Sequence, residues 1–348
     1  MFVIEKGINL SHWLSQVFGW SPREVFVTED DIIKIKKFGF DHVRLPIDEE
    51  ELWDIEGNKL PQAWQCMINC IEWCEKHNLK LVLDMHILRS HHFNAANHEG
   101  AMTLWSEPAA QENFLALWTQ LSAKLKLYST DVLAYELMNE PVAPQHDMWN
   151  KLLDKLYTHV RALEPKRTLV IGSNMWQTPK TYPHLVIPEN DPNIILSIHT
   201  YDPLLLTHYK AYWLPIKDFK GSIQYPGIPI SEADLNVSAD QASSQLKAMV
   251  KEHNIFFDRD SLLKIMQPAI DAAKRFKLPL YCSEFGCLPS VPSEMRMQYY
   301  KDMISNFKSA KIAHCHWDLK GDFGIINWDR VSYVNKEANI ELIEILTK

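Results

Sequence analysis

The 348-residue chain lacks the usual features of a nucleic-acid-binding or membrane protein. It has no run of Lys or Arg, and its 36 basic residues are outnumbered by 44 acidic ones, giving a net charge of −8. This balance argues against a nucleic-acid surface and against a polybasic membrane patch. No apolar run approaches the ~20 residues that cross a bilayer. We therefore expect neither nucleic acid nor a membrane among its partners, and the oligomeric state stays open.

The first residues also lack the parts of a secretion signal. Met1–Lys6 leads directly into an expected strand, with no basic stretch, apolar core or small-residue cleavage site. We expect a cytoplasmic protein, or a secreted one if a signal was excised before Met1.

Cysteine pairs and nucleotide-binding glycines are missing as well. None of the six cysteines belongs to a Cys-x-x-Cys pair, and Cys66, Cys70 and Cys74 have the spacing of one helix face. Side chains so arranged are poorly placed to bridge one another, so we expect buried thiols. No Gly-x-Gly-x-x-Gly follows the first strand, which weakens a dinucleotide-binding fold. A bridge stays open among the three cysteines near the last two expected strands, Cys282, Cys287 and Cys315.

What the chain does contain is an alternation of strands and helices, without linker, repeat or low-complexity segment. Expected strands are Gly7–Leu10, His42–Pro46, Lys80–Met85, Val132–Leu137, Thr168–Gly172, Ile194–His199, Leu280–Ser283 and Ile312–Trp317. Expected helices are Glu29–Phe38, Ala63–His77, Gln111–Tyr128, Asp147–Leu163, Ser261–Phe276, Glu294–Ser309 and Lys336–Leu346. Strands joined by helices pair in parallel, and eight of them fit a closed ring. We predict an α/β fold, a (β/α)₈ TIM barrel forming one domain over residues 1–348.

One segment departs from this alternation. Residues 202–257, after the sixth strand, are rich in aromatic residues and prolines and turn helical around Gln241–His253. A loop this long in a compact barrel is usually functional. We expect a wall or lid over the site rather than a second domain.

Two glutamates stand where apolar strands end. Glu140 and Glu284 follow the fourth and seventh strands, which lie almost opposite one another in an eight-stranded barrel. Two carboxyl groups about 5–5.5 Å apart are the machinery of retaining glycoside cleavage. Asn139 could hydrogen-bond a sugar hydroxyl beside them. The twelve tryptophans also suit a carbohydrate cleft, because indole faces stack on sugar rings.

The chain resembles glycoside hydrolase family 5, a clan A family of (β/α)₈ barrels. Residues 139–141 (Asn-Glu-Pro) are similar to its acid/base motif, and residues 283–286 (Ser-Glu-Phe-Gly) to its nucleophile motif. Residues 7–14 (Gly-Ile-Asn-Leu-Ser-His-Trp-Leu) resemble the start of many members. The resemblance implies a retaining enzyme without metal or cofactor, with Glu140 as general acid/base and Glu284 as nucleophile.

The resemblance also implies substrate-binding roles for other strand-end residues. An arginine beside Glu284 would lower the pKa of that carboxyl, and Tyr201 could donate a hydrogen bond to it. Trp317 would stack beneath the sugar. Burial and the negative charge of Glu284 should raise the pKa of Glu140. The substrate-binding set is Arg44, His86, Asn139, His199, Tyr201 and Trp317.

Several other residues are open to either a structural or a functional role. For Glu136 we expect a structural role inside the barrel, and Asp84 stays open. Loops expected at the C-terminal end of the barrel carry further candidates for sugar contacts. Residues 320–322 resemble a sugar-binding loop of some relatives. These candidates are His12, Trp105, Trp149, Trp176, Lys320 and Asp322, with His91 and His92 beside them.

Two other classes and several substrates remain as alternatives. A metal-dependent hydrolase would use the cluster His86, His91, His92 and His98, but the His-x-His after the first strand is missing. A sugar-binding barrel without activity would typically lack one of the two glutamates. As substrate we expect a β-linked oligo- or polysaccharide. An endo-β-1,4-glucanase is the first choice, and an exo-acting β-glucosidase, a β-1,3-glucanase or a mannan-active enzyme is the alternative.

Overall fold

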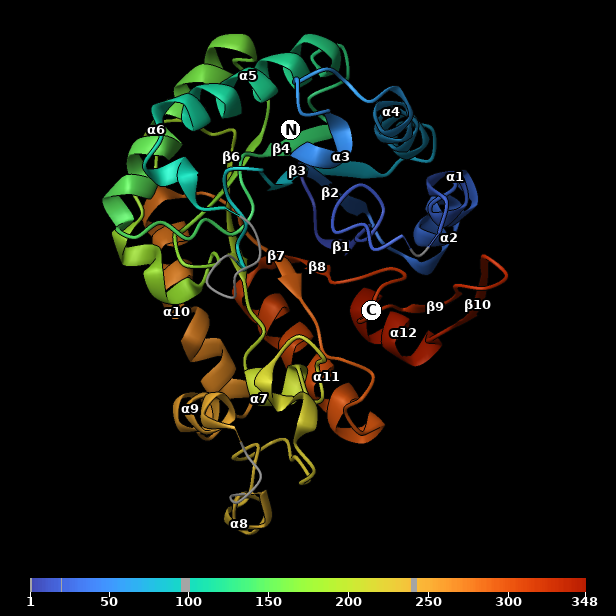
Figure 1. Cartoon of the computed structure of the whole chain (residues 1–348), viewed down its shortest axis with the longest axis vertical. Coiled ribbons are helices and arrows are strands. Elements are labelled where there is room, and N and C mark those ends of the chain that lie inside the picture. Colours follow the sequence, from blue (N-terminus) through green and yellow to red (C-terminus); the bar gives the residue numbers. More distant parts are fainter. Residues whose placement is uncertain (1, 20, 95–100, 239–242) are drawn as a thin grey trace.

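The computed structural model describes residues 2–19, 21–94, 101–238 and 243–348, without the side chains of 236–238. Eight parallel strands form a closed barrel in chain order (Figure 1), and β8 pairs with β1 to complete the ring. Their bounds are β1 Lys6–Asn9, β2 His42–Asp48, β3 Lys80–Ile87, β4 Leu133–Glu136, β5 Leu169–Gly172, β6 Ile194–His199, β7 Leu280–Phe285 and β8 Ile312–His316. The prediction of a (β/α)₈ barrel is confirmed, each strand within two residues of its expected bounds.

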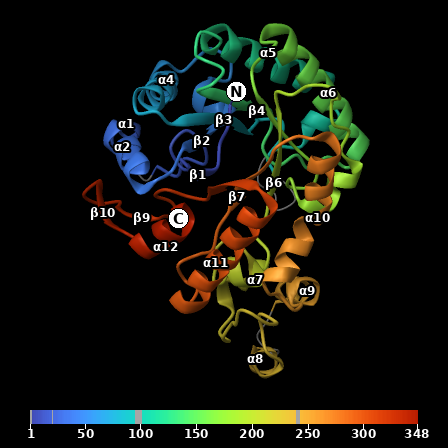
Figure 2. The same ribbon diagram turned by 180° about the vertical axis from the view of Figure 1, so that it is seen from behind.

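Helices surround the ring, as both views show (Figure 2). The longer ones are α2 Glu29–Phe38, α4 Pro61–Lys76, α5 Pro108–Leu125, α6 His146–Leu163, α9 Ser244–His253, α10 Arg259–Phe276, α11 Ser293–Ala310 and α12 Ile340–Thr347. The short ones are α1 Arg23–Phe26, α3 Glu49–Leu52, α7 Leu204–Thr207 and α8 Glu232–Ser238. Helix α2 has its predicted bounds because Thr28 caps its start and Gly39, at φ +100°, ends it. Within the described residues, no helix combines the length and apolarity that a bilayer crossing requires.

Layers of side chains fill the inside of the barrel. One layer is apolar or aromatic and includes Val82, Ala134, Val170, Ile195 and Tyr281, all buried. Side chains alternate along a strand, so the residue two positions further also points inward. That next layer is polar: Arg44, Asp84, Glu136, Ser197 and Ser283, with Gly172 on β5. The active-site candidates therefore rest on a layer built mainly from strand residues.

The end of the chain differs from the prediction. The expected helix Lys336–Leu346 is wrong in its first part, because Val334–Ala338 is strand β10 and pairs antiparallel with β9, Ile326–Asp329. Helix α12 begins only at Ile340. Lys336, Glu337 and Ala338 favour a helix locally, but pairing with a strand elsewhere in the chain overrides that preference.

The segment 202–257 has two parts. Its first part stays beside the barrel, where the rings of His208 and Trp213 contact Phe323 of the loop after β8. Helices α8 and α9 lie further out, and α8 is at the far tip of the molecule in both views (Figures 1 and 2). The first part therefore forms a wall near the strand ends. Of the helix expected around Gln241–His253, residues 241–242 lie outside the described part of the chain.

All six cysteines are buried and unpaired. The prediction of buried thiols at Cys66, Cys70 and Cys74 on α4 is confirmed, and the bridge left open among the other three cysteines is not formed.

Candidate active site

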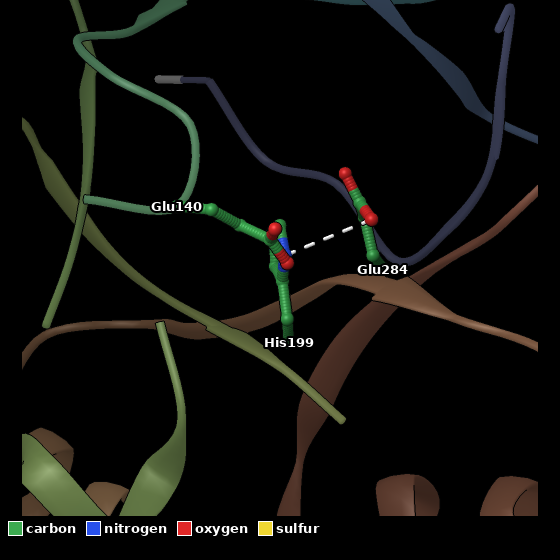
Figure 3. A group of neighbouring side chains, drawn as sticks. All are labelled: Glu140, His199 and Glu284. Carbon is green, nitrogen blue, oxygen red and sulfur yellow. Dashed lines mark hydrogen bonds and ion pairs between the residues drawn. The ribbon is translucent and has the colours of Figure 1, made fainter. Parts of the chain in front are cut away.

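The two strand-end glutamates lie close together at the C-terminal end of the barrel. One oxygen of Glu140, one of Glu284 and a ring nitrogen of His199 all lie within 4.8 Å of one another. Figure 3 shows these three side chains reaching the same point from separate segments of the chain. The spacing is close to the 5–5.5 Å typical of retaining rather than inverting glycoside hydrolases, which need roughly 6.5–9.5 Å.

A register shift between β6 and β7 helps to bring these groups together. The pairing moves on by one residue between Ile198 and His199, so that His199 lies opposite Glu284. Such irregularities redirect side chains and are common next to active sites. Two neighbouring residues of β7, Ser283 and Glu284, can thereby both reach the site.

Arg44 is the electrostatic centre of the site. Its guanidinium is fully buried and binds three carboxylates, with N–O distances of 2.7 Å to Glu136, 2.7 Å to Glu284 and 3.0 Å to Asp84. It also donates to Asn139 Oδ1 at 2.8 Å. Burial lowers the pKa of Arg44, but the three carboxylates raise it well above its ordinary value. The arginine therefore keeps its charge.

The two catalytic candidates differ in their charged neighbours. Burial, followed by the charge of Glu284, raises the pKa of Glu140 well above its ordinary value. Burial also raises the pKa of Glu284, but Arg44 works against this shift through its bond to that carboxylate. When the pair shares one proton, these neighbours favour the proton on Glu140. The prediction that Arg44 lowers the pKa of Glu284 describes only one contribution, because burial is larger.

His199 joins the acid/base candidate to the polar layer. Its Nδ1 is 2.8 Å from Glu140 Oε1, and its Nε2 is 2.9 Å from Ser283 Oγ. Burial, with Arg44 and His86 nearby, lowers the pKa of His199 well below its ordinary value. The ring is therefore neutral and holds Glu140 by a hydrogen bond rather than by an ion pair.

Tyr201 and Trp317 complete the surroundings of Glu284. Tyr201 donates its hydroxyl to Glu284 Oε2 at 3.0 Å, and burial keeps the pKa of this phenol well above its ordinary value. Trp317 stacks on His86, with ring centroids 5.5 Å apart and planes 12° apart. Burial lowers the pKa of His86 to about 3, so the ring is neutral. Its Nδ1 lies 2.6 Å from Asp84 and donates to that carboxylate. Its Nε2 is left as an acceptor.

The barrel interior explains the two carboxylates that the sequence left aside. Glu136 accepts from Arg44 and Gln177, which supports its expected structural role. Asp84 also holds Arg44, and burial raises the pKa of Asp84 to about 7 although Arg44 opposes this. Both keep the guanidinium in place.

Two of the loop candidates, Trp149 and Lys320, are wrong as sugar contacts, whereas Trp105, as buried as Trp317, stays a prediction. Trp149 is 1% exposed, and its indole N–H donates to the carbonyl of Gly172 inside the core. Trp105 is also buried in the main core. Lys320 is buried and forms an ion pair with Asp31 of α2 at 2.8 Å. A strand-end or loop position alone does not show whether a side chain turns into the protein.

The other three candidates lie nearer to the site. Trp176 is 41% exposed, and its backbone N–H donates to the carbonyl of Pro141, next to Glu140. The ring of His12 meets that of Trp317 edge-on at 6.4 Å. Asp322 accepts a hydrogen bond from Tyr212 at 3.2 Å.

Among the described residues, His86, His91 and His92 do not have metal-ligand spacing. His91 is buried and accepts the backbone N–H of Val142, while His86 is bound to Asp84. Among the residues that the structure describes, the only group with metal-ligand spacing is Glu140, His199 and Glu284. His98 lies outside the described residues.

Sequence reasoning missed Gln177, Ser197 and Ser283. The Ser197 and Ser283 hydroxyls are 2.6 Å apart, and Gln177 donates to Ser197 at 3.1 Å. Both serines lie two residues beyond an inward-facing apolar or aromatic residue of the same strand. The alternation of side chains along a strand could therefore have identified them. Gln177 lies on the loop after β5 and follows no such pattern.

A parallel (β/α)₈ barrel with paired glutamates after β4 and in β7 defines the class of retaining glycoside hydrolases. The family model for cellulase, glycosyl hydrolase family 5, matches residues 4–323. The chain belongs to this family and is a glycoside hydrolase. The resemblance seen in the sequence is confirmed.

Curated proteins and solved structures agree with this membership. Endoglucanase C of Acetivibrio thermocellus is 33% identical, with 100% of this chain and 99% of the relative covered. Cellodextrinase A of Ruminococcus flavefaciens is 28% identical, covering 86% of this chain and 80% of the relative. The crystal structure of endoglucanase Cel5A from Thermotoga maritima superposes with a TM-score of 0.74 at 23% identity, covering 98% and 96%. The last comparison concerns the fold.

Proposed function

We propose that the protein is an endo-β-1,4-glucanase that cleaves by double displacement, with Glu140 as general acid/base and Glu284 as nucleophile. The observation that carries this assignment is the asymmetry of a close carboxylate pair: Arg44 binds Glu284 at 2.7 Å, whereas Glu140 is bound by a neutral histidine. Full-length similarity to endoglucanase C supports a glucan substrate.

In the first step, Glu284 attacks the anomeric carbon and the bond to the leaving oxygen breaks. Glu140 transfers its proton to that oxygen, so the departing sugar leaves as a neutral alcohol. Tyr201, which donates to Glu284 at 3.0 Å, helps to keep the attacking carboxylate ionised and oriented.

In the second step, the ester at Glu284 no longer carries a negative charge. Burial still raises the pKa of Glu140, but the repulsion from Glu284 is gone, so Glu140, which has given up its proton, can now accept one from water. The resulting hydroxide attacks the anomeric carbon from the face that the first sugar left. The bond to Glu284 breaks, and the product keeps its original configuration.

The remaining residues are proposed to hold the sugar. Asn139 is 1% exposed and, within the described residues, its Nδ2 has no hydrogen-bond partner. A buried donor without an acceptor is costly, so a sugar hydroxyl is a fitting partner. Trp317 offers an indole face backed by His86, whose Nε2 can accept a hydroxyl proton.

The decisive test compares wild type with Glu284→Ala and Glu140→Ala on β-1,4-glucan, β-1,3-glucan, mannan, xylan and aryl β-glycosides. Wild type should lower the viscosity of soluble β-1,4-glucan early and release oligosaccharides of mixed length. Both variants should fold, as circular dichroism checks. Glu284→Ala should lose activity on every substrate, and Glu140→Ala should lose it on the polysaccharides, whose leaving groups need a proton. An active Glu284→Ala variant would remove the nucleophile assignment, and a wild type that binds but cuts none of these sugars would favour a binding barrel.

A second candidate is an exo-acting enzyme that trims short oligosaccharides. Similarity to a protein named cellodextrinase A favours it, as does the wall that Trp213 and His208 form beside the strand ends. Release of a single short product without a drop in viscosity would select this candidate over the endo-acting one.

A further inference from the structure

One strand of the polar layer supplies no side chain. The inward position of β5 beside Ser197 of β6 is Gly172, two residues beyond Val170, which pairs with Glu136 of β4. The carboxamide of Gln177, from the loop after β5, occupies that space instead. A Cβ on Gly172 would lie 2.4 Å from Gln177 Cγ and 2.5 Å from its Nε2. Glycine at this position makes room for a side chain that returns from outside the strand.

Gln177 uses all parts of its amide inside the barrel. Its side chain is fully buried, and its Oε1 accepts the backbone N–H of Glu140 at 2.8 Å. Its Nε2 donates to Glu136 Oε1 at 3.0 Å and to Ser197 Oγ at 3.1 Å. Its own carbonyl accepts the backbone N–H of His199 at 3.1 Å. One residue thus joins the ends of β4 and β6, which carry Glu140 and its partner His199.

The backbone on both sides of this contact is left-handed. Met175, Trp176 and Gln177 have φ values of +58°, +59° and +53°, and Glu140 has φ +43°. Residues with side chains rarely adopt this region, and they stay there only where surrounding contacts hold them. The bond between Gln177 Oε1 and the Glu140 N–H connects the two left-handed stretches.

We propose that Gln177 is a positioning residue for Glu140. It does not touch the reacting atoms. It fixes the backbone of Glu140, so that the carboxyl stands against His199 and faces Glu284 across the space where the leaving oxygen receives its proton. The inference rests on the proposed role of Glu140 as general acid/base.

The test uses leaving groups that differ in their need for an acid. Dinitrophenolate departs without a proton, whereas phenolate needs one. Gln177→Met keeps the length of the side chain but neither donates nor accepts as the amide does. We expect kcat/KM for phenyl β-cellobioside to fall about 10–100-fold, since small misplacements of catalytic groups cost this much. With 2,4-dinitrophenyl β-cellobioside, kcat/KM should stay within about twofold of wild type.

Two further variants keep the test independent of the folding of a single variant. Gly172→Ala leaves Gln177 in the sequence but places a methyl group against its amide, so it should show the same dependence on leaving group. Gln177→Glu should recover most of the lost activity. Buried beside Glu136, the new carboxyl stays protonated, accepts the Glu140 N–H and donates its O–H to Glu136.

Asn174→Leu is the matched control. Asn174 is buried on the same loop and makes two hydrogen bonds to the backbone of Ala143, at 2.8 Å and 3.0 Å, three residues beyond Glu140. This variant should lower the melting temperature as Gln177→Met does. It should leave the ratio of kcat/KM for the two substrates unchanged.

The pH profile gives a second readout. A Glu140 that moves away from Glu284 has a lower pKa, so the alkaline limb of kcat/KM should shift to lower pH in Gln177→Met and not in Asn174→Leu. The positioning role would be overturned if Gln177→Met lost kcat/KM equally on both aryl cellobiosides. It would also be overturned if Gln177→Met and Asn174→Leu showed the same ratio of kcat/KM for the two substrates. Glu140→Ala in the same series separates the two claims, because its failure to show leaving-group dependence would refute the acid/base assignment itself.

Discussion

Each end of the barrel holds a buried cluster of the same three residue types. The clusters are Arg44, Glu284 and Tyr201 at the C-terminal end, and Arg167, Glu164 and Tyr135 at the N-terminal end. In both, the arginine binds the glutamate and the tyrosine hydroxyl donates to it. Yet only the first cluster faces the site, so the difference must come from the arginine's other partners.

Those partners separate a structural cluster from a chemical one. Arg167 directs its remaining N–H groups to backbone carbonyls, among them those of Ser129, Tyr128 and Leu133, and so ties the start of β4 to the start of β5. Arg44 instead faces three carboxylates. One positive charge cannot balance three negative ones, so protons are retained near Arg44. This surplus is what proton-transfer chemistry can use.

The largest contrast is expected from removing each arginine. Arg44→Met should lower kcat by about 10²–10³-fold or more, because Glu284 loses the charge that keeps it ionised. Arg167→Met should instead cost about 3–5 kcal/mol of stability by leaving Glu164 buried without its partner. Steady-state kinetics and urea unfolding of both variants provide the measurement. A comparable fall in kcat for folded Arg167→Met would abolish the distinction between the two ends.

The tyrosines give a matched pair with a smaller effect. Tyr201→Phe removes a hydrogen bond to the nucleophile, and bonds to charged groups are worth about 1.5–3 kcal/mol, or roughly 10–100-fold in kcat/KM. Tyr135→Phe removes the equivalent bond to Glu164, 2.9 Å long, and should change only the unfolding free energy. If Tyr135→Phe slowed the reaction as much as Tyr201→Phe, the N-terminal cluster would have to act on the site.

The pH dependence should belong to the C-terminal cluster alone. Activity requires ionised Glu284 and protonated Glu140, whose pKa values burial raises. The value of kcat/KM should therefore fall when the pH drops below the pKa of Glu284 and when it rises above the pKa of Glu140. The expected slope is about tenfold per pH unit on each side. Glu140→Gln should remove the alkaline limb, and Tyr135→Phe should leave both limbs in place.

The smallest effect on the kinetics is expected from two tryptophans at the same end of the barrel. Trp176→Ala should raise KM for longer oligosaccharides about fivefold, corresponding to ~1 kcal/mol of stacking, with kcat little changed. Trp149→Ala should cost about 3–5 kcal/mol of stability, because its indole is buried in the core, and leave KM as in wild type. An unchanged KM in Trp176→Ala would remove Trp176 from the candidate subsites.

Most of the barrel could be read from local patterns, since strand and helix periods show directly in the sequence. Ile194–His199 and Glu29–Phe38 have their predicted bounds because apolar runs and caps mark both ends. The helix predicted from Lys336 is wrong over residues 336–338, because their strand depends on pairing with Ile326–Asp329. Pairing between distant segments leaves little trace in local composition.

The site was predictable where a residue able to do the chemistry stands at the end of a strand, as Glu140 and Glu284 do. It was not predictable where the direction of a side chain decides its role. Lys320 lies beside Asp322 in sequence, but it turns inward to Asp31. Gln177 enters the barrel from a loop because Gly172 leaves space for it, and a single sequence does not show such a vacancy.

The ring closes through contacts between the earliest and latest parts of the chain. Strand β8 pairs with β1, and Lys320 binds Asp31 across 289 positions. Glu284 likewise follows Arg44 by 240 positions. During synthesis, Asp84 and Glu136 are therefore available to bind Arg44 before β7, which carries the nucleophile Glu284, has been made. Closure over such separations is slow, so the nascent protein acquires its chemistry only after β7 and β8 have been synthesised.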